Sequence, residues 1–181
     1  MIKIPKVLTL FLFVSLAMLS SCSLRPDPRF YTEEPAEETL IAPRDEAQDV
    51  LLSEREKLLN RFKNEIRKFW QAPYKWGGDS PSGTDCSGLI VTLYKNAAFI
   101  NLPHSTEQLW ANGSPVRLER LVFGDLVFFN NKGGRAPDHV GMYIDKGYFL
   151  HASVSKGVTL SKLSDRPWNR VYVGARRILK E

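Results

Sequence analysis

The residue best suited to chemistry in this sequence is Cys86, which lies in the stretch GTDCSGLI at positions 83–90. Small and polar residues lead directly into an apolar helical stripe, so the sequence predicts a helix that begins at or near Cys86. There, the helix dipole and free amide groups favour a thiolate over a thiol, and the same amides are able to stabilise an oxyanion. The alternative is a buried, unreactive cysteine, against which the polar neighbours argue. The predicted chemistry is nucleophilic attack by sulfur.

A thiol nucleophile needs a base, and the chain offers three histidines, His104, His139 and His151. Residues between the last two read as a β-hairpin with a three-residue loop at 145–147. In that register Gly141 lies opposite His151, so both rings lie on one face of the hairpin as diagonal neighbours. A two-residue loop would send the rings to opposite faces. The expected register therefore decides whether these histidines are able to act together.

A cysteine, a base and a polar group that orients the base form the general scheme of an activated nucleophile. The alternative of a metal site has little support, because the chain contains no close ligand pair such as C-x-x-C or H-x-x-x-H. We expect no metal and no organic cofactor. His104 precedes another predicted helix, and we interpret it as a surface residue or a partner in a local hydrogen bond.

Helices are expected in the first part of the domain, and strands in the second. An amphipathic pattern runs from Leu51 to Trp70 and ends before Pro73, while Ser105 to Gln108 reads as a capping box that opens a third helix. Short β-rich runs follow at 126–129, 140–144, 148–151, 158–160 and 171–175. This order predicts an α+β domain with a mostly antiparallel sheet.

The N-terminus reads as an export signal followed by an anchor. Lys3 and Lys6 precede an apolar run at 7–18 that is too short to span a bilayer. The run ends in Leu-Ser-Ser-Cys22, which resembles the bacterial lipobox, and an ordinary signal peptide with a chance cysteine is the alternative. Lipidation would consume the thiol of Cys22, so we expect no disulfide with Cys86. Ser23 after the anchor favours the outer membrane of a Gram-negative host.

Charge and composition divide the chain into three parts. We predict a signal peptide at 1–21, an acidic, proline-containing tether at 22–50 and one catalytic domain at 51–181. Residues 23–50 carry eight acidic and three basic residues, and repeated prolines with like charges favour an extended spacer. The domain is basic, but its charges are scattered rather than clustered. We therefore expect no nucleic-acid partner, and attraction to an anionic wall polymer is the alternative to a simply solvated surface.

Several blocks of the domain resemble a known family in the same order along the chain. They are YKWGG at 74–78, DCSGLI at 85–90, LP at 102–103, GDLVFF at 124–129, HVGMY at 139–143 and HA at 151–152. Together they resemble the NlpC-type family of cell-wall cysteine peptidases. This resemblance implies a papain-like fold, in which the helix that carries the cysteine packs on the sheet.

The resemblance also implies roles for individual residues. Cys86 is expected to be the nucleophile, His139 the base and His151 the residue that orients the base. Tyr74 is expected to lie beside the thiol, and Asp85 and Ser87 to help bind a stem peptide. Two positions depart from the family pattern and bear on substrate choice or pKa: His104 stands where an arginine commonly follows Leu-Pro, and Asp138 stands where a small polar residue commonly precedes the base.

The implied activity is hydrolysis of a peptidoglycan stem peptide next to diaminopimelate, by a monomer that is anchored to the membrane through Cys22. The bond is either the D-alanyl cross-link or the one that follows γ-D-glutamate. A regulatory protein partner is compatible with the sequence but not indicated by it. Two other classes remain: a non-catalytic wall-binding lipoprotein, which the intact Cys86, His139 and His151 disfavour, and a lipid acyltransferase, in whose relatives the histidine precedes the cysteine.

Overall fold

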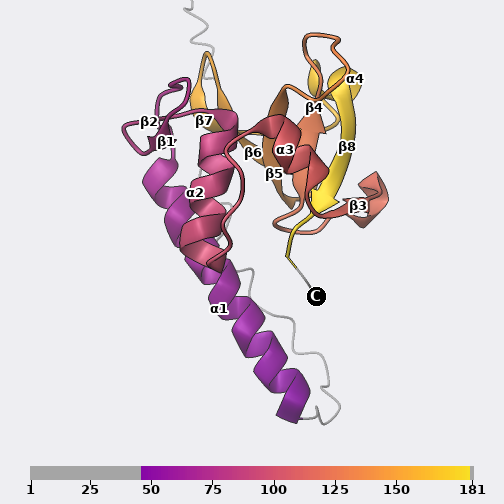
Figure 1. Ribbon diagram of the computed structural model, residues 1–181. Helices are drawn as coiled ribbons and strands as arrows, with labels where there is room; N and C mark the ends of the chain where they lie inside the picture. The colour runs from indigo at the N-terminus through magenta and orange to yellow at the C-terminus, as the bar shows by residue number, and fades with distance from the viewer. Residues whose placement is uncertain (1–45, 180–181) are drawn as a thin grey trace, which may run out of the picture.

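The computed structural model describes residues 46–179, and these form an α+β fold, as the sequence predicts (Figure 1). Cys22 and most of the predicted tether lie outside the described residues. The elements are α1 (Glu46–Phe69), β1 (Asp79–Ser80), β2 (Gly83–Thr84), α2 (Cys86–Ala98), α3 (Thr106–Ala111), β3 (Ser114–Val116), the 3-10 helix η2 (Leu118–Arg120), β4 (Leu126–Phe129), β5 (His139–Asp145), β6 (Tyr148–Ser153), β7 (Gly157–Lys162), α4 (Trp168–Val171) and β8 (Tyr172–Arg177).

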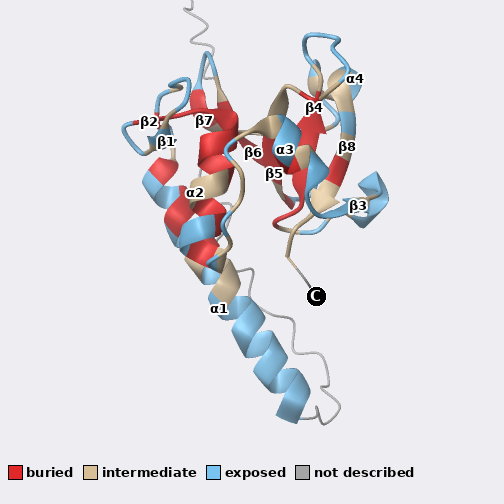
Figure 2. Cartoon of the chain, in the orientation of Figure 1, coloured by how far each residue is buried: buried red, intermediate tan, exposed pale blue. Residues whose placement is uncertain are grey.

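Helix α1 begins at Glu46, so the last residues of the predicted tether are helical. Only its C-terminal half packs on the domain, through Phe62, Ile66 and Phe69, and its N-terminal half is exposed (Figure 2). The sequence predicts Leu51 in the buried stripe, but 70% of its surface is exposed. The helical period therefore predicts the element correctly and overestimates the length of its buried face, because the rest of the domain does not extend that far.

One antiparallel sheet of six strands carries the second half of the domain, in the order β3-β8-β4-β5-β6-β7. Helix α2 packs beside α1 and contacts β5 and β6 (Figure 1). Alternation along the strands sends Val140, Met142 and Leu150 into the core shared with α1 and α2. The opposite face carries a second, smaller core that includes Phe129 and Phe149. This second core surrounds the histidine pair described below.

The predicted capping box is not formed. Ser105 is the N-cap of α3, but its side chain makes no capping hydrogen bond, and its backbone carbonyl accepts from the Leu109 N–H at 2.8 Å. Among residues 46–179, no helix combines the length and the apolar character needed to cross a membrane.

Candidate active site

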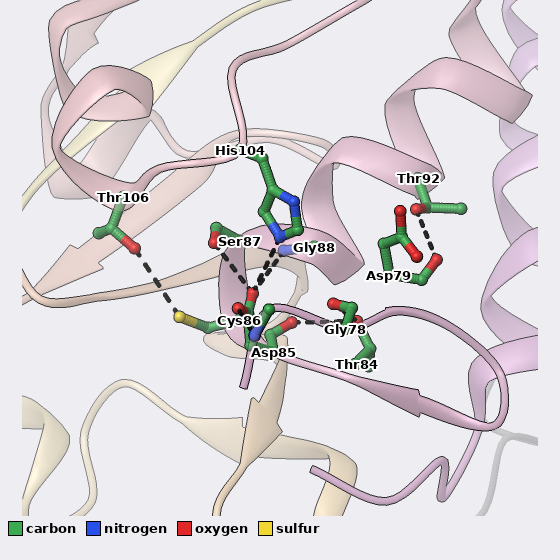
Figure 3. Close-up of polar contacts among 11 residues, drawn as sticks. Gly78, Asp79, Thr84, Asp85, Cys86, Ser87, Gly88, Thr92, His104 and Thr106 are labelled. Carbon is green, nitrogen blue, oxygen red and sulfur yellow. Dashed lines mark hydrogen bonds and ion pairs between the residues drawn. The ribbon is translucent and has the colours of Figure 1, made fainter. Parts of the chain in front are cut away.

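Cys86 is the first residue of α2, which confirms the predicted helix start. Asp85 is the N-cap, and its Oδ1 accepts hydrogen bonds from the Gly88 N–H at 2.7 Å and from the Ser87 hydroxyl at 2.9 Å (Figure 3). Its Oδ2 accepts from the Gly77 N–H at 2.8 Å, and these amide donors, together with the Ser87 hydroxyl, hold the pKa of Asp85 below its usual value despite burial. The carboxylate therefore fixes the loop at Gly77 against the start of the helix that carries the cysteine.

A close backbone approach explains the glycine after the Asp-Cys-Ser sequence. A Cβ on Gly88 would lie 2.0 Å from the carbonyl oxygen of Gly78 and 2.8 Å from Nε2 of His104. The ring of His104 lies against the same helix start, where Nε2 is 3.4 Å from Oδ1 of Asp85 (Figure 3). Thus His104, interpreted from sequence as a surface or locally bonded residue, belongs to the packing around the start of the helix that carries Cys86.

The thiol of Cys86 is nearly enclosed, with 7% of the residue exposed. Its Sγ lies 3.7 Å from the hydroxyl oxygen of Thr106 (Figure 3), and the backbone N–H of Val140 also donates to it. Burial raises the pKa of Cys86, and these hydrogen bonds only partly oppose it. The expectation of a lowered thiol pKa, drawn from the helix dipole, is therefore wrong for this structure. The contact with Thr106 joins two helices, and no local pattern in the sequence indicates it.

The histidine hairpin reaches the expected register by a different route. Lys146 and Gly147 both have positive φ, 49° and 83°, and form a two-residue turn instead of the predicted three-residue loop. The extra residue sits in a β-bulge at Ile144, between the Tyr143–Phe149 and Asp145–Tyr148 pairs. The bulge restores the side-chain alternation that a two-residue loop alone would have reversed.

His139 and His151 therefore lie on one face, as the sequence predicts. Nε2 of His139 is 3.0 Å from Nδ1 of His151, and the two rings are nearly perpendicular. Gly141 leaves the room between them, since a Cβ there would lie 3.3 Å from Cβ of His151 and 2.6 Å from the Phe149 ring. The remaining nitrogen of His151, Nε2, lies 2.9 Å from the hydroxyl oxygen of Ser161 on β7.

Aromatic rings enclose the pair. The indole of Trp168 stacks on His139 with centroids 5.4 Å apart and meets His151 edge-on at 4.7 Å. Burial lowers the pKa of His139 to about 4, and the nearby charge of Asp138 only partly opposes this. Burial, and then the charge of His139, also lower the pKa of His151. Both rings are therefore neutral at neutral pH.

The structure brings the predicted groups to one end of the sheet, but it does not join thiol and imidazole by a hydrogen bond within residues 46–179. The thiol instead contacts the N–H of Val140, the residue directly after His139. The side chain of Asp138 holds the loop before it, accepting from the Asn131 and Lys132 N–H groups at 2.9 and 2.8 Å. Nδ1 of His139 is the ring nitrogen that remains for a proton from sulfur.

Three residues, Tyr74, Asp85 and Ser87, are expected to lie near the thiol or the substrate. Tyr74 pairs with Thr84, and burial and then the charges of Cys86 and Asp85 raise its pKa. Its place beside the thiol stays a prediction. Asp85 and Ser87 are 7% and 6% exposed and bond to each other, so their contact with substrate stays a prediction. In the described part of the chain, no group of three or more His, Cys, Asp or Glu side chains is arranged to hold a metal ion.

Known proteins share this arrangement of elements. Residues 71–177 match the NlpC/P60 family. The chain is 37% identical over 125 residues to murein DD-endopeptidase MepH of Escherichia coli, covering 67% of this chain and 45% of that relative. It is 31% identical over 169 residues to murein DD-endopeptidase MepS/murein LD-carboxypeptidase of Escherichia coli, covering 90% of this chain and 87% of that relative.

Among solved structures, an NlpC/P60 family protein from Bacillus cereus has 35% identity and a TM-score of 0.60, covering 69% of this chain and 40% of that one. This likeness confirms the predicted papain-like α+β fold. The chain spans less than half the length of MepH and of the Bacillus cereus protein. What those whole proteins do is therefore a starting point for a proposal about this chain.

Proposed function

Because the chain belongs to the NlpC/P60 family, we propose that it is a cysteine peptidase of the cell envelope that hydrolyses amide bonds in peptidoglycan stem peptides. One observation carries the proposal. The hydrogen-bonded pair His139–His151 lies on β5 and β6, and β5 also provides the Val140 N–H that donates to the thiol of Cys86. This arrangement supports the assignment of Cys86 as nucleophile, His139 as base and His151 as the group that orients the base.

The proposed reaction begins with a neutral pair. The Cys86 thiol gives its proton to Nδ1 of His139, and Sγ attacks the carbonyl carbon of the amide, moving the C=O electron pair to oxygen. Free amide groups in the first turn of α2 stabilise this oxyanion. His139 then returns the proton to the departing amine as the C–N bond breaks. Water, activated by His139, hydrolyses the thioester and regenerates the thiol.

His151 acts through His139 in this scheme. With Nδ1 of His139 free to accept a proton, Nε2–H of His139 donates to Nδ1 of His151. The hydrogen bond holds the ring in that tautomer and stabilises the imidazolium that forms during attack, which is the role of the third member of a catalytic triad. Tyr74, Asp85 and Ser87 are proposed to line the stem-peptide site beside the thiol.

The names of two relatives as murein DD-endopeptidases favour the D-alanyl cross-link over the bond that follows γ-D-glutamate. Purified sacculi digested with the protein, followed by mass analysis of the fragments, distinguish the two bonds. Cleavage of the cross-link converts dimeric muropeptides to monomers with intact stems. Cleavage after γ-D-glutamate instead leaves a dipeptide on the glycan.

The matched variant is Cys86→Ala, which removes one sulfur atom and keeps the N-cap of α2. We expect it to fold with an unchanged circular dichroism spectrum and to release no fragments. Full activity in Cys86→Ala would contradict the peptidase proposal. Retained binding to sacculi, without cleavage by the wild-type protein under any condition, would instead favour a non-catalytic wall-binding protein.

We also propose that the chain is anchored by lipid at Cys22, which lies outside the described residues. The support is the short apolar run that ends in Leu-Ser-Ser-Cys22. Mass analysis of the mature N-terminus is expected to find acyl chains on Cys22, and fractionation is expected to place the protein in the outer membrane of a Gram-negative host. Cys22→Ser is expected to release the protein from membranes with its activity intact, and an unmodified Cys22 would overturn the anchor.

A further inference from the structure

The hydrogen bonding that joins His139 to His151 continues beyond His151. On the neighbouring strand β7, Ser161 pairs with Phe149, and its hydroxyl oxygen lies 2.9 Å from Nε2 of His151. Three side chains from three consecutive strands therefore form one line of hydrogen bonds, from His139 on β5 through His151 on β6 to Ser161 on β7. Among residues 46–179, Ser161 is the last member of this line.

Within the described residues, His151 has no alternative partner for that nitrogen. Only 1% of the residue is exposed, its Nδ1 faces His139, and the rings of Phe149 and Trp168 cover its sides, with centroids 5.0 and 4.7 Å away. A buried ring N–H without an acceptor is costly. Whatever binds Nε2 of His151 therefore influences which of its two nitrogens carries the proton.

The line of hydrogen bonds has two neutral arrangements, because a serine hydroxyl is able to donate or accept. In one, Nε2–H of His151 donates to Ser161 and Nδ1 of His151 accepts from His139, which leaves Nδ1 of His139 free to take the thiol proton. In the other, every proton is reversed, and Nδ1 of His139 already carries a hydrogen. Only the first arrangement supports the reaction, and it requires Ser161 to accept.

The same requirement holds when charge develops. Once the thiol proton has moved, His139 is an imidazolium that donates through Nε2 to His151. His151 must then keep its own proton on Nε2, and a polarised N–H donor is stabilised by an acceptor at its far end. An acceptor at Ser161 is thus useful in the resting state and in the charged intermediate.

We propose that Ser161 is a positioning residue of this site, whose hydroxyl accepts a hydrogen bond from Nε2–H of His151 and thereby keeps His139 in its reactive tautomer. The proposal rests on the function proposed above and adds to the Cys-His-His set a fourth residue that acts through His151.

Three variants test it on sacculi. Ser161→Ala is expected to lower kcat about 10-fold with KM little changed, because a buried N–H loses its acceptor and water replaces it only in part. Ser161→Thr keeps the hydroxyl and is expected to restore most of the activity. Thr159→Val is the matched control: Thr159 lies directly opposite His151 on β7, on the same face, and makes no hydrogen bond to the ring within the described residues. It is expected to behave as wild type.

A tautomer measurement separates this role from a merely structural one. Nitrogen NMR of the wild-type protein is expected to find Nε2 of His151 protonated and Nδ1 unprotonated, and Ser161→Ala is expected to show a mixture. In a His151→Asn background, which has no Nε2, Ser161→Ala is expected to cost no further activity.

Wild-type activity in Ser161→Ala, or an equal loss in Thr159→Val, would overturn the role of Ser161. If His139→Ala is inactive in the same assay, the proposed function still stands. A fully active His139→Ala would overturn the proposed function itself.

Discussion

The acid limb of the pH–rate profile offers a direct test of the neutral thiol–imidazole pair. In the proposed mechanism His139 accepts the thiol proton only when its ring is neutral, and burial lowers the pKa of His139 from 6.5 to about 4. Activity is therefore expected to persist as the pH falls below 6.5 and to be lost around pH 4. At about 1.4 kcal/mol per pH unit, burial disfavours the charged ring by about 3 kcal/mol.

Replacing Trp168 is the way to change the pKa of His139. Its indole stacks on His139, with ring planes 25° apart, while Phe129 lies on another side at 6.0 Å. The charged or titratable groups that act on His139 are Asp138, which raises its pKa, and His151, which is itself neutral. In Trp168→Ala, water replaces one of the two aromatic neighbours, so the pKa of His139 is expected to rise by about one pH unit.

The assay is kcat/KM on a soluble cross-linked muropeptide over the range from acid to mildly alkaline pH, with a titration of His139 followed by NMR in the same protein. Trp168→Phe keeps an aromatic ring over the imidazole and controls for loss of packing. We expect its acid limb to stay near that of the wild type. A wild-type acid limb near the unperturbed histidine pKa of 6.5, or an acid limb that does not move in a folded Trp168→Ala, would refute the view that burial sets this pKa.

Other outcomes follow from the same geometry. His139→Ala is expected to lose about 10³-fold or more in kcat, while His151→Asn, which keeps a hydrogen-bonding group, retains measurable activity and His151→Ala loses more; the opposite order would exchange the two roles. Iodoacetamide is expected to label Cys86 slowly at neutral pH, because burial raises the pKa of its thiol, and labelling as fast as a low-pKa cysteine would contradict the neutral pair. The lowered pKa of His139 alone is expected to remove about 3 kcal/mol of stability as the pH drops from 6.5 to 4, since the unfolded chain binds a proton there that the folded one excludes. Urea unfolding at several pH values measures this, and a stability independent of pH over that range would contradict it.

Much of the fold can be predicted from the spacing at which apolar residues recur along the sequence. The apolar stripe that ends before Pro73 and the helix that begins at Cys86 are local signals. The second helix begins where the sequence predicts it, and the first ends there but begins earlier, at Glu46. The strands β4 to β8 also match the expected runs. The short elements β1, β2, β3 and α4 are not predicted, because two to four residues carry no period that distinguishes a strand or a helical turn from a loop.

Side-chain partners that depend on pairing between distant strands are harder to predict. Alternation puts Ser161 on the face of His151 only once the register between β6 and β7 is known. The predicted register of the histidine hairpin is correct although its predicted turn is not, because the bulge at Ile144 and the two-residue turn have opposite effects on alternation. A register that puts both rings on one face can be reached through more than one combination of turn and bulge.

The pKa of the Cys86 thiol shows why a local argument is insufficient at this site. A helix N-terminus stabilises a nearby negative charge by about 0.3–1 kcal/mol, and the residues around Cys86 alone are enough to infer this stabilisation. Removing a thiolate from water costs on the order of several kcal/mol. This desolvation cost depends on how completely the sheet, Thr106 and α2 enclose the sulfur. Because desolvation outweighs the helix dipole and depends on tertiary packing, the resting sulfur is a thiol. In the proposed mechanism its activation comes with proton transfer to a neutral His139, and on that proposal the tautomer of the histidine pair matters more than the position of Cys86 on its helix.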